Sequence, residues 1–217
     1  MNREPLVLCL TNSVAATFTA NCLLAIGARP AMVEEPSEAA ELAAVADALL
    51  VNLGTVTARQ AEAMRRAVEV ARARRAPWVL DPVGVQFLSF RRQLARELLA
   101  LRPSLIRGNR AEVDFLSPTD VPALATGETD VVRLPPPDGD SVAISGGSPL
   151  LQAVTATGCA QGGVCAALLG RGLTPREACL SASRLFKRAG ERAAERARAP
   201  GSFLPAFIDA LWELAHD

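Results

Sequence analysis

The sequence has 217 residues, 50% of them hydrophobic and 21% charged, with a formal net charge of +0 at pH 7. A chain of this length can bury a substantial core, and we expect a single domain over residues 1–217. The balanced charge and the absence of an apolar run of ~18 residues argue against nucleic acid or a membrane as a partner.

Short apolar runs alternate with helical patterns in the first half of the chain. Strands are predicted over residues 6–12, 30–35, 49–54, 77–84 and 103–109, and helices over 13–28, 36–48, 57–75 and 89–101. Ser37 and Thr57 are the expected N-caps of two of these helices. Strands that are apolar throughout and alternate with helices predict a largely parallel sheet covered on both faces.

Polar residues follow four of these strands. They are Thr11-Asn12, residues 52–55, Asp81-Pro82-Val83-Gly84 and Arg107-Gly108-Asn109. The carboxyl ends of parallel strands meet at one edge of the sheet, where ligands bind in such folds. The sequence therefore predicts a functional site at this edge.

The second half has a different pattern. Two short β-like pieces at 131–134 and 142–145 flank the turn sequence PPPDGD. A helix is predicted from about residue 157 to 169, and another over 174–199 that opens with a capping box of Thr174 and Glu177. An amphipathic helix over 202–217 ends the chain.

The stretch VTATGC, residues 154–159, places Cys159 at the start of a predicted helix. Free N–H groups of a first helical turn bind anions and stabilise a thiolate, so we expect the pKa of Cys159 to lie below that of a free thiol. Such a group could deprotonate a hydroxyl that attacks a phosphate. Alternatively, Cys159 is a small residue of the core.

The cysteine and histidine content limits the chemistry further. The five cysteines contain no CxxC pair, which is typical of reduced thiols in the cytoplasm, and the first residues lack the pattern of a signal peptide. The one histidine, His216, lies at the C-terminal end. This excludes histidine-based metal sites and Ser-His or Cys-His triads.

The sequence RGNRAE, residues 107–112, contains a second group of candidates. Asn109 and Glu112 are three residues apart, and Asp81 ends a neighbouring strand. One or two carboxylates beside bound phosphates suit Mg²⁺, and Arg107 could pair with phosphate oxygens. Alternatively, Asn109 caps a helix and Glu112 is solvated.

Five motifs in the same order resemble the hydroxyethylthiazole kinase family, which has the ribokinase-like fold. They are CLTNSVAATFTANCLLAIGARPAMVEEPSEA, DALLVNLGTV, PWVLDPVG, LIRGNRAEV and VTATGC. The resemblance covers most of the chain. It implies a three-layer α/β/α domain around a largely parallel sheet.

The resemblance also implies a reaction, the ATP-dependent phosphorylation of 4-methyl-5-(2-hydroxyethyl)thiazole in thiamine salvage, with Mg²⁺ as cofactor. Met32 would contact the thiazole, and Asn21, Gly54 and Ala156 would lie near the same pocket. The family is trimeric with active sites between subunits, so a homotrimer is implied.

The remaining site residues also follow from the resemblance. ATP would bind to Arg107, Thr126, Thr157 and Gly158. Asp81 and Glu112 would organise magnesium. Cys159 would stand where related sugar kinases use an aspartate base.

The sequence departs from the family pattern at two places. Ala156 replaces a glycine of the family, and its methyl group is costly if the residue needs a positive φ. The segment between Glu112 and Thr126 is too short for the family's crossover helix, so we expect a loop there, an uncovered patch on one sheet face and weakened ATP binding.

These departures motivate two alternatives. The chain could be a degenerate homologue that binds a thiazole-like ligand without catalysis. It could also be a kinase of another small alcohol, such as hydroxymethylpyrimidine or pyridoxal.

Overall fold

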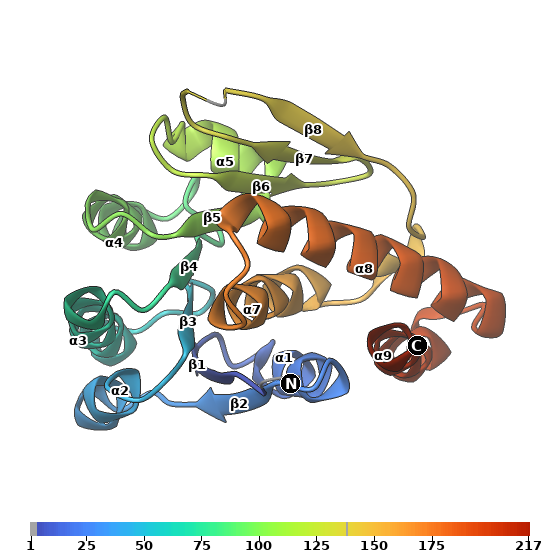
Figure 1. The fold of residues 1–217 in the computed structure, drawn as a ribbon, viewed down its shortest axis with the longest axis horizontal. Helices are drawn as coiled ribbons and strands as arrows, with labels where there is room; N and C mark the ends of the chain where they lie inside the picture. Colours follow the sequence, from blue (N-terminus) through green and yellow to red (C-terminus); the bar gives the residue numbers. More distant parts are fainter. Residues whose placement is uncertain (1–3, 138) are drawn as a thin grey trace.

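One eight-stranded sheet organises the residues that the computed structural model describes, 4–137 and 139–217. The strands are β1 (Leu6–Leu10), β2 (Arg29–Met32), β3 (Ala48–Asn52), β4 (Trp78–Asp81), β5 (Leu105–Asn109), β6 (Ala123–Thr126), β7 (Asp130–Arg133) and β8 (Ser141–Ile144). They lie in the order β2-β1-β3-β4-β5-β6-β7-β8 (Figure 1). The pairs from β2 to β6 are parallel, whereas β7 and β8 add antiparallel strands. The predicted largely parallel sheet is confirmed.

Helices cover both faces of the sheet (Figure 1). One face carries α2 (Pro36–Ala43), α3 (Ala58–Arg74), α4 (Ser89–Ala100) and α5 (Arg110–Leu116). The other carries α1 (Ala16–Ala25), α7 (Thr157–Gly170), α8 (Pro175–Arg196) and α9 (Pro200–His216), with the short α6 (Leu150–Ala153) before α7. The three-layer architecture implied by the resemblance is therefore present.

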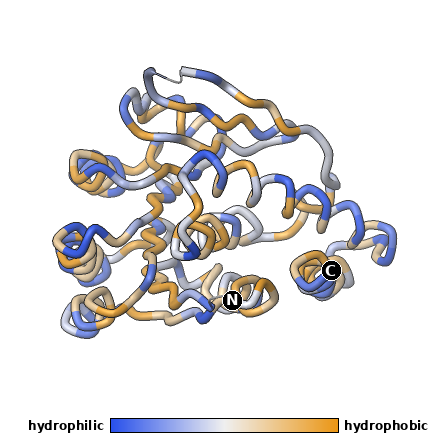
Figure 2. Tube along the Cα trace, in the orientation of Figure 1, coloured by the Kyte–Doolittle hydropathy of each residue, from blue (hydrophilic) through white to orange (hydrophobic). Residues whose placement is uncertain are grey.

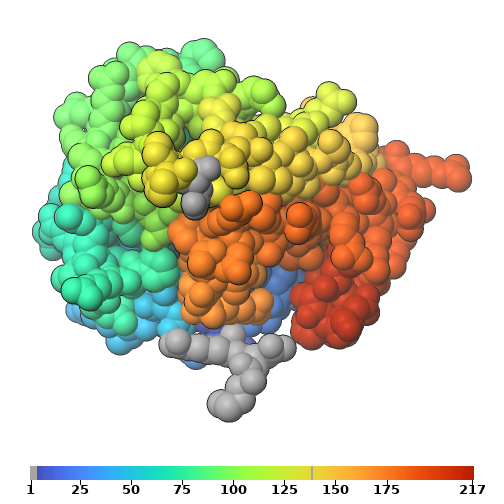
Figure 3. All heavy atoms as spheres, turned by 45° about the horizontal axis from the view of Figure 1, so that its top comes forward, coloured from blue at the N-terminus to red at the C-terminus, as the bar shows by residue number. Residues whose placement is uncertain are grey.

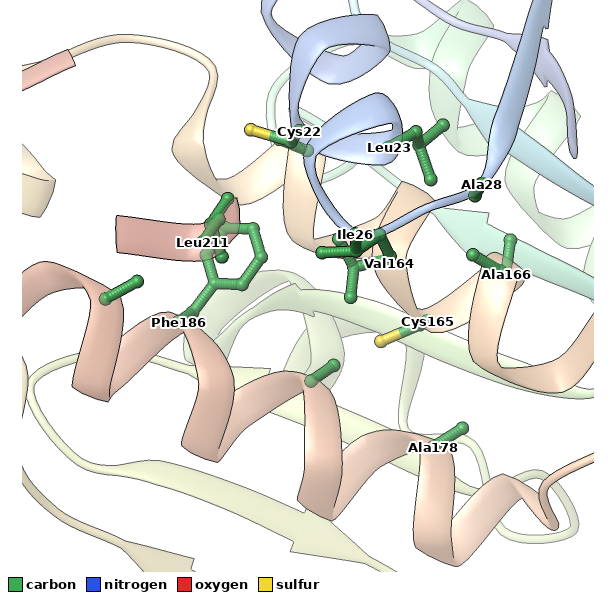
Figure 4. Packing of buried hydrophobic residues seen from close by; sticks show 14 of the residues in the cluster. Cys22, Leu23, Ile26, Ala28, Val164, Cys165, Ala166, Ala178, Phe186 and Leu211 are labelled. Carbon is green, nitrogen blue, oxygen red and sulfur yellow. The ribbon is translucent and has the colours of Figure 1, made fainter. Parts of the chain in front are cut away.

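Each face of the sheet has its own apolar core. Every residue of β3 and β4 is buried, as expected for strands that are covered on both sides. Figure 2 shows hydrophobic residues concentrated along these central strands. In Figure 4, Leu23 of α1 and Ile26, the C-cap of this helix, lie near Val164 and Cys165 of α7, and Phe186 points into the same cluster. Helix α7 is thus enclosed between the sheet, α1 and α8.

Local capping explains where several helices begin. Thr57 is the N-cap of α3, as predicted, and it forms a capping box with Gln60. The predicted capping box of Thr174 and Glu177 starts α8. The prediction for Ser37 was wrong, because α2 begins at Pro36 with Glu35 as its N-cap. Proline fits the first helical position, where its missing N–H costs no hydrogen bond. The Ser37 hydroxyl instead donates to the Glu35 carboxylate at 3.3 Å.

The connection from β5 to β6 contains a helix, so the predicted helix-free loop was wrong. Asn109 and Glu112 form a capping box that starts the seven-residue α5. Residues 110–122 provide the length of about a dozen residues that a parallel crossover needs. Ala123, Leu124 and Ala125 of β6 are at most 1% exposed. The expected uncovered patch is therefore absent over β6, although Ser141 and Ala143 of β8 are exposed.

Strands β7 and β8 confirm the two β-like pieces to within one residue. Of the turn that joins them, Asp138 lies outside the described residues. Figure 3 shows this part of the chain, in yellow, at the surface beside α8, in orange. Among the described residues, no helix has the length and apolar character needed to cross a membrane.

Candidate active site

The polar residues that end the parallel strands do meet at one edge of the sheet. Asn52 of β3 is in register with Asp81 of β4, and Asn109 of β5 with Thr126 of β6. Asn12 follows β1 at the same edge. Helix α7 begins beside them, because Asn12 Nδ2 lies 3.3 Å from Cys159 Sγ. The predicted convergence of the strand ends is confirmed.

A row of buried hydrogen bonds joins these strand ends. Asn12 Nδ2 donates to Asn52 Oδ1 at 2.9 Å, and Asn52 Nδ2 donates to Asp81 Oδ2 at 2.6 Å. Arg107 Nη1 lies 3.6 Å from the same Asp81 oxygen in a buried ion pair. Buried polar groups need such partners to avoid a large desolvation cost. Each side chain in this row is therefore fixed by its neighbours.

Cys159 faces a hollow of about 230 Å³. The hollow is lined by Asn12, Val14, Ala15, Gly54, Thr55, Val83, Arg91, Thr155, Ala156 and Cys159. Unlike the other four cysteines, which are buried, Cys159 is partly exposed. Its sulfur accepts a hydrogen bond from Asn12. The alternative reading of Cys159 as an inert core residue does not fit this position.

The expectation of a lowered pKa at Cys159 was wrong. Burial, and next the nearby Asp81 carboxylate, raise the pKa of this thiol to about 11, against the opposing effects of Arg107 and the Asn12 hydrogen bond. The position at a helix N-terminus does not outweigh the loss of solvent. Cys159 therefore carries its proton at neutral pH.

Ala156, which stands where the family has a glycine, adopts the left-handed backbone conformation that glycine favours. It is the N-cap of α7 with φ 73° and ψ −7°, and its side chain makes no capping bond. A residue with a Cβ pays roughly 1–2 kcal/mol for this conformation. The chain thus accommodates the methyl group with local strain, and α7 still begins at Thr157.

The first turn of α7 lies directly against Arg107. A side chain at Gly158 would place its Cβ 2.5 Å from Arg107 Nη1, so only glycine permits this approach. The Thr157 hydroxyl donates to the Leu151 carbonyl at 2.9 Å. Its backbone N–H lies in the first turn of α7, where N–H groups have no partner within the helix. The combination of a guanidinium with a helix N-terminus favours an anion.

The four predicted ATP-binding residues line one cavity of about 470 Å³, which we call the Arg107 cavity. Its lining includes Arg107, Asn109, Thr126, Gly127, Asp130, Leu151, Gln152, Thr157, Gly158, Gln161 and Lys187. A second cavity of about 580 Å³ shares Gly127, Leu151, Gln152 and Lys187 with it. Arg107 Nη2 donates to Thr126 Oγ1 at 2.8 Å, so these two side chains act as one surface.

The first turn of α7 lies between the Arg107 cavity and the hollow. Thr157 and Gly158 line the Arg107 cavity, whereas Ala156 and Cys159 line the hollow. An anion on one side and a hydroxyl on the other would meet at this turn. The arrangement suits the transfer of a group between two ligands.

Asp81 and Glu112 are suited to hold a divalent cation. Asp81 is fully buried, and its Oδ1 has no hydrogen-bond partner. Burial, and to a smaller extent the Glu112 charge, raise the Asp81 pKa to about 7, against the effect of Arg107. Glu112 accepts N–H bonds from Gly84 and Asn109 at 2.9 and 2.8 Å, so it is ordered rather than solvated. An unpartnered carboxylate oxygen beside a second carboxylate fits Mg²⁺.

The three other predicted substrate residues do not all share the hollow. Gly54 lines it, and a Cβ there would lie 2.6 Å from Asn12 Nδ2. Asn21 does not line the hollow but lines two shallow cavities beside α9. One of them shares Val14, Thr155 and Ala156 with the hollow, so Asn21 lies near it, as predicted. Met32, at the end of β2, is 37% exposed and is not among the residues that line the hollow.

Sequence reasoning missed several residues of the site. Arg91 of α4 lines the hollow and donates to the Val83 carbonyl at 3.1 Å. Gln161, Asp130 and Lys187 line the Arg107 cavity. One signal was available for Lys187, which is the only lysine in a sequence that otherwise uses arginine.

Comparison with known proteins gives consistent matches over the whole chain. Residues 1–122 and 117–217 match the hydroxyethylthiazole kinase family. The hydroxyethylthiazole kinase of Escherichia coli O157:H7 is 45% identical, and that of Escherichia coli strain K12 is 44% identical. Each alignment covers 99% of this chain and 91% of the relative. Each alignment spans 242 positions, more than the 217 residues here, so the relatives contain residues that this chain lacks.

Solved structures agree. The hydroxyethylthiazole kinase protein from Pyrococcus horikoshii OT3 has a TM-score of 0.91 at 33% identity, covering 97% of this chain and 89% of that one. The pyridoxal kinase from Staphylococcus aureus in complex with ADP has a TM-score of 0.65 at 15% identity, covering 88% of this chain and 89% of that one. The second match shows a shared fold only.

The strain at Ala156 gives a prediction about stability. Ala156→Gly should raise the free energy of unfolding by about 0.5–1 kcal/mol, because relief of the left-handed strain exceeds the added entropy of the unfolded chain. Urea denaturation measures it. Ala160→Gly, within the right-handed part of α7, should instead lower the free energy of unfolding by about 1 kcal/mol or more. Equal losses in the two variants would show that Ala156 is not strained.

Proposed function

The chain belongs to the hydroxyethylthiazole kinase family, and we propose that its edge site transfers the terminal phosphoryl group of ATP to the hydroxyethyl oxygen of 4-methyl-5-(2-hydroxyethyl)thiazole. One observation carries the assignment of the site. Gly158 and Cys159 are consecutive residues, yet they line different cavities. The two reactants can therefore approach the same helical turn from opposite sides.

The Arg107 cavity would bind the nucleotide. Arg107, Thr126, Thr157 and Gly158 line it together, and the last two begin α7, where the backbone N–H groups have no partner within the helix. This combination supports binding of the phosphates there. The adjoining cavity offers room for the nucleoside. Phosphoryl transfer depends mainly on positioning and on stabilising charge, and these groups supply both.

The hollow would bind the thiazole alcohol. Gly54 and Ala156 form part of its wall, and Cys159 would meet the hydroxyl. We assign Cys159 as the base that accepts the hydroxyl proton while the oxygen bonds to phosphorus. Because its pKa is about 11, only the thiolate fraction can accept this proton, and Asn12 supports that fraction by donating to Sγ.

Asp81 and Glu112 would hold Mg²⁺ at the phosphate end of the site. When bound, the cation would offset the negative charge of the phosphates. The unpartnered Asp81 Oδ1 supports this assignment. In the part of the chain that the structure describes, no group of three or more His, Cys, Asp or Glu residues could hold a metal ion. Because Mg²⁺ has six coordination positions and commonly takes only one or two carboxylates, Asp81 and Glu112 would leave positions for phosphate and water.

We further propose the homotrimer that the family resemblance implies. Val14, which lines the hollow, is 59% exposed, and Phe87 of the segment before α4 is 84% exposed. Exposed apolar groups near a site are common where subunits meet. A site between subunits would also allow Met32 to reach the thiazole bound by a neighbouring copy.

The proposed function is tested by the reaction itself. Purified protein with ATP, Mg²⁺ and the thiazole alcohol should form ADP and the phosphate ester, with a higher kcat/KM than for hydroxymethylpyrimidine or pyridoxal. Chromatography of the products measures both. Thiazole binding without turnover of any nucleoside triphosphate would support the degenerate homologue and reject the proposal.

The base role of Cys159 gives a second prediction. Cys159→Ala should lower kcat at least about 100-fold while the Kd for the thiazole changes little. The wild-type kcat should rise with pH between 7 and 9, because the thiolate fraction grows below a pKa of about 11, and the variant should lose this rise. Steady-state kinetics and calorimetry measure these quantities.

Cys179→Ala is the matched control, since this buried thiol of α8 does not line the hollow. It should retain the wild-type pH profile. If Cys159→Ala keeps the rise of kcat with pH, the base is another group.

A further inference from the structure

A second buried polar cluster borders the Arg107 cavity, around Asp130 of β7. The Asp130 cluster consists of Asp130, Gln161 of α7 and Lys187 of α8, all of which line the cavity. Ser183 of α8 also binds Asp130 but does not line the cavity, so it is not counted in the cluster. Asp130 Oδ2 accepts hydrogen bonds from Ser183 Oγ at 2.7 Å and Gln161 Nε2 at 3.4 Å. Its Oδ1 accepts the Gly127 N–H at 3.1 Å and lies 3.5 Å from Lys187 Nζ. All four side chains are buried, so their arrangement is set by these contacts.

Lys187 fixes the turn that follows β6. Its Nζ donates to the carbonyls of Gly127 at 3.0 Å and Glu128 at 2.7 Å, besides the ion pair with Asp130. Asp130 binds the Gly127 N–H from the other side. An ammonium group can donate three hydrogen bonds in different directions, whereas a planar guanidinium cannot match this arrangement. The turn next to Thr126 is therefore clamped through both its N–H and its carbonyl groups.

Gln161 connects the same carboxylate to Arg107. Arg107 Nε donates to Gln161 Oε1 at 3.3 Å, while Gln161 Nε2 donates to Asp130. Asp130 thereby orients the Gln161 amide, with its oxygen toward the guanidinium. Arg107 Nη2 is held by Thr126, so the guanidinium has a partner on each side within the cavity wall.

We propose that the Asp130 cluster positions the phosphate-binding groups: Gln161 aims the Arg107 guanidinium, and Lys187 holds the Thr126–Gly127 turn. The inference rests on the proposed function, because it assigns these roles toward the phosphates of ATP. Gln161, Asp130 and Lys187 all line the cavity that would contain them. None of them lines the hollow around Cys159. The cluster should therefore affect nucleotide binding and leave thiazole binding unchanged.

Gln161→Met tests the link to Arg107, because methionine keeps the length and removes both hydrogen bonds. The Kd for ATP should rise about tenfold, as expected for loss of a hydrogen bond to a charged group. The Kd for the thiazole, measured without nucleotide, should stay within about twofold. Calorimetry measures both with the full chain. In an Arg107→Ala background, Gln161→Met should have no further effect on ATP binding, because its action passes through Arg107.

Ser183→Ala is the control, since Ser183 binds the same Asp130 oxygen but contacts neither Arg107 nor the cavity. It should leave the Kd for ATP within about twofold of wild type.

Lys187→Arg keeps the charge, yet should weaken ATP binding because a guanidinium cannot hold the Thr126–Gly127 turn as the ammonium group does.

Three results would overturn the inference: unchanged ATP affinity in Gln161→Met, an equal loss of thiazole affinity, or an equal effect of Ser183→Ala. A wild-type protein that binds no ATP would instead reject the proposed function, and the inference with it. The wild-type titration therefore separates the two failures.

Discussion

The structure depends on one continuous row of buried polar contacts along the carboxyl edge of the sheet. In spatial order the row contains Cys159, Asn12, Asn52, Asp81, Arg107, Gln161, Asp130 and Lys187. The members come from β3, β4, β5 and β7, from the segment after β1 and from helices α7 and α8, and each uses its neighbour as a hydrogen-bond or ion-pair partner. Charges and amides buried this deeply are tolerated only because the row is continuous. It therefore fixes the register between the sheet and α7, and with it the relative placement of the two cavities.

This constraint explains how a short helical turn can serve two ligands. The backbone at Gly158 approaches Arg107 because no side chain intervenes, while Cys159 is held against Asn12. Burial at this edge raises the pKa values of Cys159 and Asp81, because its effect exceeds those of the Arg107 charge and the Asn52 hydrogen bonds, which lower them. The site is thus ordered before any ligand arrives, and catalysis would use positioning more than a reactive ground state.

Much of this was predictable from the sequence, for identifiable reasons. Apolar strand runs and the residues that follow them predicted the sheet and its functional edge, because parallel strands place their carboxyl ends together. Contacts between distant residues were not predictable. The burial that raises the Cys159 pKa and the Gln161–Asp130 link depend on α7 packing against strands far away in sequence. The α5 helix was missed, although Asn109 was considered as a helix cap, because the segment up to Thr126 was judged too short to contain a helix.

The central claim is that α7 presents its first turn to both reactants. A crystal structure with a non-hydrolysable ATP analogue, Mg²⁺ and the thiazole alcohol tests it most directly. The terminal phosphate should accept hydrogen bonds from the N–H groups of Thr157 and Gly158 and from Arg107, with the alcohol oxygen within about 3.5 Å of the transferred phosphorus and in contact with Cys159 Sγ. Phosphates bound away from this turn, or an alcohol that does not reach Cys159, would contradict the account.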